Sequence, residues 1–106
     1  MNQTQSLEEH LNALHNELNT AAKTEDAEAR KHIDEALQHL EAAQAQLKTR
    51  TGARTEQIGQ HLDVLKEHGA QAANEHGDAL RVRIHKMIAA CRNAMERCIE
   101  EQTMTP

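Results

Sequence analysis

The chain contains no phenylalanine, tyrosine or tryptophan, and its only proline is the last of its 106 residues. Aromatic side chains usually supply much of a globular core, so this interior must be built from aliphatic residues, methionine, alanine and cysteine. Only 21 residues are Leu, Ile, Val or Met, whereas 17 are alanine. Few bulky apolar residues, much alanine and no internal proline favour long amphipathic helices, so we predict an all-α protein.

Other absences weigh against several functional classes. Ser6 is the only serine, and neither a Gly-rich phosphate loop nor a nucleophile-elbow motif is present, so we expect no enzyme and no cofactor. A net charge of -5 without aromatic stacking residues argues against nucleic-acid binding. No apolar stretch approaches the roughly 20 residues that span a bilayer. Two cysteines and a polar start of the chain indicate a reducing, cytoplasmic location.

Two segments of the chain resemble each other at an offset of 51 residues. The segment LEEHLNALHNELNTAA, which begins at Leu7, aligns with IGQHLDVLKEHGAQAA, which begins at Ile58. Further on, Arg30 aligns with Arg81 at the same offset. The similarity indicates either a tandem duplication or two amphipathic helices of similar composition, and both interpretations predict the same local structure in the two halves.

Apolar residues recur in steps of four, three and four, so that equivalent positions return every 11 residues. Eleven residues make nearly whole helical turns, so the stripe stays on one side of an almost straight helix. Glu25 and His76 interrupt the stripe, and they too are 51 residues apart. The stripe consists of Leu7, Leu11, Leu14, Leu18, Ala22, Ala29, Ile33, Ala36, Leu40 and Leu47, then Ile58, Leu62, Leu65, Ala73, Leu80, Ile84, Met87, Cys91, Met95 and Cys98.

We predict one helical domain over residues 1–106, with helical halves at about 6–50 and 55–102 and a frayed tail at 103–106. Ser6 and Glu9 form a capping box at the start, and Gly52 suits a left-handed helix end. The favoured architecture is a long antiparallel helical hairpin that pairs with a second copy into a four-helix bundle, because one hairpin leaves its stripe uncovered.

A single-chain four-helix bundle is the alternative architecture. It requires each half to break again, near residues 24–26 and near Gly77 and Asp78, and it makes a monomer feasible. Two observations favour the long hairpin: no glycine or proline precedes Gly52, and the apolar stripe crosses both candidate breaks in phase.

Histidines and sulfur side chains suggest a metal site. The chain has eight histidines, and Met87, Cys91, Met95 and Cys98 share the apolar side of the last helix. A hairpin folded near residue 52 brings the beginning and the end of the chain together, which predicts a copper or zinc site. The candidate ligands are His10, His15, Cys91 and Cys98. Against this, histidine is also a common polar residue beside a helical seam, and methionine and cysteine are ordinary core residues.

Basic residues concentrate near the end of the chain. Residues 80–99 contain one acidic side chain, Glu96, and five basic ones: Arg81, Arg83, Lys86, Arg92 and Arg97. Such a helix binds an acidic partner or a membrane surface, or it neutralises an acidic helix beside it. We expect a small non-enzymatic protein that acts through self-association and through binding a macromolecular partner. The alternatives are a metal-binding bundle and a membrane-surface amphipathic protein.

Overall fold

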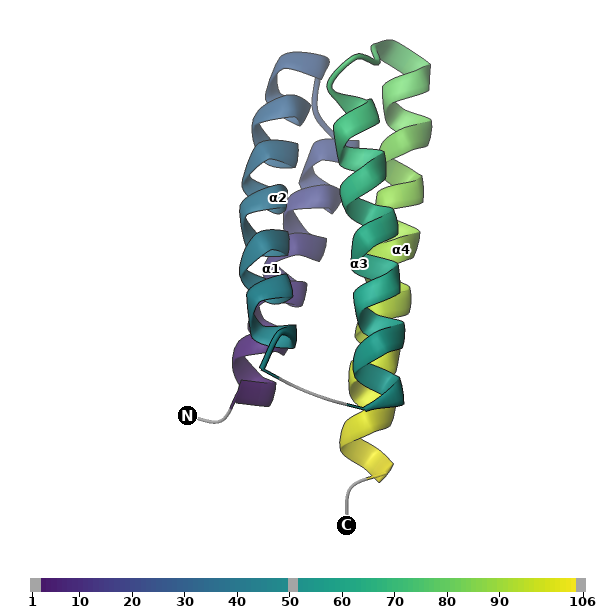
Figure 1. Ribbon diagram of the computed structural model, residues 1–106. Helices are drawn as coiled ribbons and strands as arrows, with labels where there is room; N and C mark the ends of the chain where they lie inside the picture. The colour runs from purple at the N-terminus through teal and green to yellow at the C-terminus, as the bar shows by residue number, and fades with distance from the viewer. Residues whose placement is uncertain (1–2, 50–51, 105–106) are drawn as a thin grey trace.

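Four helices form two antiparallel hairpins that pack side by side (Figure 1). The computed structural model describes the backbone of residues 3–49 and 52–104 and the side chains of residues 7–49, 52 and 55–98. The helices are α1 (Gln3–Ala22), α2 (Asp26–Leu47), α3 (Ala53–Ala72) and α4 (Gly77–Met104). The bundle measures 46 × 23 × 20 Å. The predicted all-α four-helix bundle is confirmed, and one chain supplies all four helices.

The preference for two long helices was wrong, and the first break lies between α1 and α2. The hydroxyl of Thr24 donates to the carbonyl oxygen of Ala21 at 3.2 Å, and the Thr24 N–H donates to the same oxygen at 3.3 Å. Glu25 is extended, with φ -72° and ψ 162°, and its carbonyl accepts from the N–H of Ala29 at 2.7 Å. A threonine side chain that bonds the backbone locally ends a helix without any glycine or proline.

The second break lies between α3 and α4. The N–H groups of Asn74 and Glu75 close tight turns onto Gln71 and Ala72 at 3.1 Å each. Gly77 then has φ +59°, a left-handed conformation that glycine adopts without steric cost. Glycine therefore begins α4 here instead of ending the helix before it.

Helix boundaries differ from the sequence-based expectation at three places. Gly52 has the expected positive φ, +123°, but it directly precedes α3 and does not end the helix before it. Helix α1 begins at Gln3, ahead of Ser6, whose side chain lies outside the described residues. Helix α4 continues to Met104, so it enters the predicted tail, and residues 105–106 of that tail are not described.

The apolar stripes of the four helices pack against one another within one chain. Large side chains from all four helices are less than 2% exposed, so a second copy is not needed to cover them. These residues are Leu7, Leu11, Leu14, Leu18, Leu40, Ile58, Leu62, Leu65, Leu80, Ile84, Met87 and Cys91.

An arginine from the second hairpin binds the turn of the first. The guanidinium of Arg81, in α4, donates to the carbonyl oxygens of Ala22 at 2.7 Å and Thr24 at 2.9 Å. Ala22 is the last residue of α1 and Thr24 lies in the turn that follows, so no further helical turn satisfies these two carbonyls. The planar fork of arginine reaches two such oxygens at once.

An arginine from the first hairpin makes the reciprocal contact. Arg30, in α2, donates to the carbonyl oxygens of Ala73 at 3.0 Å and Glu75 at 2.8 Å. Ala73 lies 51 positions after Ala22, and Glu75 lies 51 positions after Thr24, so the two arginines bind equivalent carbonyls. The tandem duplication stays a hypothesis, but the offset found in the sequence relates tertiary contacts as well as residue types.

Candidate functional sites

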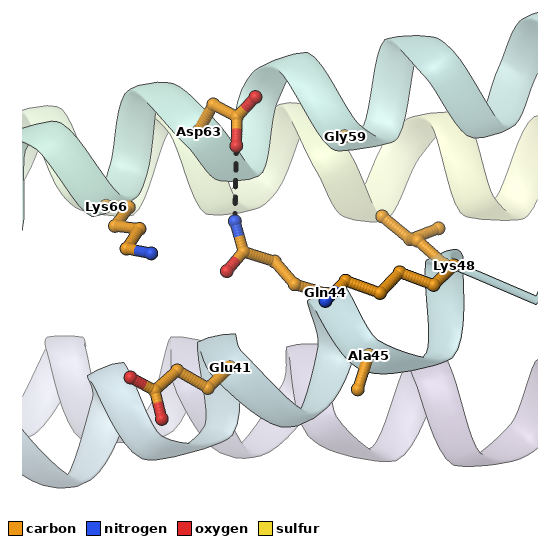
Figure 2. Close-up of a pocket in the computed structure, with 8 residues that line it drawn as sticks. Glu41, Gln44, Ala45, Lys48, Gly59, Asp63 and Lys66 are labelled. Atoms are coloured by element: carbon orange, nitrogen blue, oxygen red, sulfur yellow. Dashed lines mark hydrogen bonds between the residues drawn. The ribbon is translucent and has the colours of Figure 1, made fainter.

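The seam between α2 and α3 is open at the surface of the bundle. A cavity of about 530 Å³ lies near the end of α2, and a second of about 290 Å³ lies nearer its start. The larger cavity is lined by Glu41, Gln44, Ala45, Leu47 and Lys48 on one side and by Gly59, Asp63 and Lys66 on the other (Figure 2). Together the cavities form what we call the α2–α3 groove.

Small residues on α3 explain this shape. Gly59 faces Leu47, and a Cβ atom there would lie 4.0 Å from the nearest Leu47 methyl carbon, which is an ordinary van der Waals contact. At Gly69 the helices approach closely, and a Cβ atom would lie 2.7 Å from a methyl carbon of Leu37. The absence of side chains on α3 therefore allows close approach at one point and leaves space beside it.

The walls of the groove carry charges of both signs. Gln44 bridges them, donating from its amide nitrogen to a carboxylate oxygen of Asp63 at 3.2 Å (Figure 2). Glu41 lies on the α2 side and Lys66 on the α3 side. Since the bridge is exposed and joins two flexible side chains, it costs little to open.

The two cysteines predicted as metal ligands are buried in the bundle. The thiol of Cys91 donates to the carbonyl oxygen of Leu11 at 3.6 Å, and its sulfur lies 3.9 Å from that of Met95. Burial raises the pKa of the Cys91 thiol to about 12, so it remains protonated at neutral pH. Cys98 is 1% exposed and lines a cavity of about 110 Å³ together with Met95 and Asn12.

The two histidines predicted as ligands lie on different sides of α1. His10 faces α2, where its ring centroid is 6.3 Å from that of His39. His15 bonds Asn19 at 3.1 Å and lines a shallow cavity with Arg92 of α4. Among the described side chains, the four predicted ligands do not form a group of three or more with converging ligand atoms.

A different group converges between α1 and α2. Glu17 from α1 meets His32 and Glu35 from α2, and one potential ligand atom from each lies within 4.8 Å of the others. The ring Nδ1–H of His32 donates to a carboxylate oxygen of Glu17 at 2.8 Å. That hydrogen bond is the main reason why the pKa of Glu17 lies below its usual value. This group was not predicted from the sequence, because Glu17 and His32 meet only if α1 and α2 form a hairpin.

Two of the basic residues proposed for partner binding are engaged within the chain. Arg81 binds the α1–α2 turn, and Arg83 pairs with the carboxylate of Glu75 at 2.7 Å. The guanidinium of Arg83 also bonds Nδ1 of His68 at 2.7 Å. Burial and the charge of Arg83 lower the pKa of His68, while the hydrogen bond from Arg83 lowers the pKa of Glu75.

The remaining basic residues of the set differ in exposure. Lys86 and Arg92 are exposed on α4, whereas Arg97 is half-buried. The basic surface available to a partner is therefore smaller than the sequence suggests.

Comparisons with known proteins do not assign a function, so the fold and these sites are the basis for one. No protein-family model, curated protein or solved structure matches the chain. Within residues 3–49 and 52–104, no helix is both long and apolar enough to cross a membrane.

Proposed function

We propose that the protein acts without catalysis, by binding a helical segment of a partner protein in the α2–α3 groove. The main support for the proposal is the shape of this seam, which contains two cavities along α2. An amphipathic helix fits such a groove by placing its apolar side between two helices. Leu47 lines the larger cavity and Ile33 lines the smaller one, and both provide apolar contacts.

Wall charges favour a partner helix with both acidic and basic side chains. Glu41 and Asp63 would pair with its basic residues, and Lys48 and Lys66 with its acidic ones. Rim charges of this kind set orientation and association rate more than affinity.

The structure gives less reason to expect self-association than a long hairpin would. The apolar stripe that favoured a homodimer is buried within one chain. A homodimer stays a prediction, and the groove is where a second copy would dock. Sedimentation equilibrium at micromolar concentration distinguishes a dimer from the 11.9 kDa monomer.

A membrane-surface function has less support. The apolar residues of α4, such as Leu80, Ile84 and Met87, face the bundle core. Of the described large apolar side chains, Val64 and Val82 are the ones that are exposed.

Photo-crosslinking from the groove tests the proposal. A photoreactive residue replaces Ala45, an exposed residue in the larger cavity, and the protein is irradiated in its native cells. The matched control carries the same residue at Ala89, which is exposed on α4. We expect a discrete adduct with another protein from position 45 and none from position 89.

A blocking variant makes the test specific. Ala45→Trp fills the groove without disturbing the core, so it should abolish an adduct formed from a photoreactive residue at Ala70, which lines the smaller cavity. Ala89→Trp should leave that adduct intact. An adduct with a second copy of the chain would assign the groove to self-association, and equal labelling from positions 45 and 89 would contradict the proposal.

A further inference from the structure

We propose that Glu17, His32 and Glu35 bind one divalent transition-metal ion between α1 and α2, with Zn²⁺ as the representative ion. This site is separate from the α2–α3 groove, and neither proposal depends on the other. It also differs from the site expected from the sequence, because it includes neither cysteine and neither His10 nor His15.

The hairpin geometry brings the three side chains together. The turn at residues 23–25 sets α1 against α2 so that Glu17 and His32 meet across the seam. Glu35 is three residues beyond His32 and therefore lies on the same face of α2. Bonds of about 2.0–2.2 Å to zinc place tetrahedral ligand atoms about 3.4 Å apart. Ligand atoms that already lie within 4.8 Å of one another need only side-chain rotation to reach that spacing.

Electrostatics favour a cation at this point. Two carboxylates converge on one imidazole, which carries at most one positive charge. Like charges this close repel, whereas a divalent ion would balance both carboxylates.

The donor set selects the class of ion. Imidazole suits zinc, copper, nickel and iron, whereas magnesium and calcium prefer oxygen ligands alone. The side chains of Glu17 and His32 are 25% and 26% exposed, so water reaches the site and completes the coordination. His39 is near enough for its charge to lower the pKa of Glu17, and its ring neighbours that of His10. His39 is therefore an alternative ligand that the test must separate from His32.

Calorimetric titration of the metal-free full chain with Zn²⁺ and with Mg²⁺ at pH 7.5 tests the site. We expect one Zn²⁺ per chain and no measurable binding of Mg²⁺. Loss of even an indirect metal contact commonly costs 10–100-fold in affinity, so His32→Ala should weaken zinc binding by more than about tenfold. Glu35→Gln removes a ligand charge at an exposed position without changing the side-chain shape, and it should also weaken binding.

Matched controls exclude binding by unrelated residues. His85→Ala changes an exposed histidine of α4, and Glu41→Gln changes an exposed glutamate elsewhere on α2, so both variants should bind zinc as the unaltered protein does. His39→Ala should have a smaller effect than His32→Ala. The proposal is overturned if the unaltered chain binds no Zn²⁺, or if Glu35→Gln and His32→Ala bind it with unchanged affinity. A greater effect of His39→Ala than of His32→Ala would also overturn it.

Discussion

Replacing Arg81 with alanine should destabilise the bundle more than any other change of an exposed or half-exposed charge. The guanidinium makes two hydrogen bonds, at 2.7 and 2.9 Å, to carbonyl oxygens of the last residue of α1 and of the turn that follows it. A hydrogen bond to a charged group contributes about 1.5–3 kcal/mol. Because both bonds are only partly buried, we expect Arg81→Ala to lower the free energy of unfolding by about 2–3 kcal/mol in total. A domain of this size has a total stability of about 5–15 kcal/mol.

Thermal and urea unfolding followed by circular dichroism measure this loss. A destabilisation of 2–3 kcal/mol should lower the melting temperature by about 10–15 °C. Arg30→Ala should cost less, about 1–2 kcal/mol, because one of its two carbonyl contacts is exposed. Arg92→Ala is the control, since Arg92 is exposed on the same helix as Arg81. Surface substitutions usually change the free energy of unfolding by no more than about 0.5 kcal/mol. If the free energies of unfolding of Arg81→Ala and Arg92→Ala differ by less than that, the contact between Arg81 and the α1–α2 turn does not hold the hairpins together.

Three further predictions concern single residues. Gly59→Ala should stabilise the protein by about 0.5–1 kcal/mol in urea unfolding, because glycine is unfavourable within a helix and the added Cβ atom would make only an ordinary contact, 4.0 Å from a methyl carbon of Leu47. Gly77→Ala should destabilise it by about 1–2 kcal/mol because φ is +59°. The reverse order would contradict the backbone geometry. The pKa of His68 is lowered from 6.5, so the stability of the folded protein should fall as the pH drops below about 6.5. His68→Gln should make the melting temperature less dependent on pH in this range. An unchanged pH dependence would show that another group is responsible. Cys91, with a pKa of about 12 and no exposed surface, should react with iodoacetamide only after unfolding, and rapid alkylation of the native protein would contradict its burial.

Helical periodicity was sufficient to predict the fold class and most of the core. The stripe from Leu7 to Cys98 is buried nearly as expected, because steps of four and three residues place side chains on one side of a helix. The break between α1 and α2 was harder to predict, since it depends on one hydroxyl of Thr24 and one extended residue, Glu25. The polar interruptions were the usable signal, because Glu25 and His76 directly precede α2 and α4.

Candidate sites were harder to predict because each of them depends on the tertiary arrangement. A long hairpin would place Glu17 and His32 far apart, so their pairing was not accessible from spacing alone. Charge counts identified the basic stretch of α4, but they did not reveal that Arg81 and Arg83 are engaged within the chain. The α2–α3 groove depends on where Gly59 and Gly69 face across the seam, which composition does not specify.

A single distance tests whether the chain folds back between α1 and α2, on which the proposed metal site depends. Glu9 and Gln38 are exposed on α1 and α2, so spin labels at Glu9→Cys and Gln38→Cys in a Cys91→Ala, Cys98→Ala background leave the helix contacts intact. Labelled protein is diluted into unlabelled protein, and the distance is measured by double electron–electron resonance. The four-helix bundle predicts labels within about 20 Å of each other, since packed helix axes lie only about 8–10 Å apart. One continuous helix would separate them by about 43 Å, at 1.5 Å per residue, and a distance near that value would contradict the fold and the metal site.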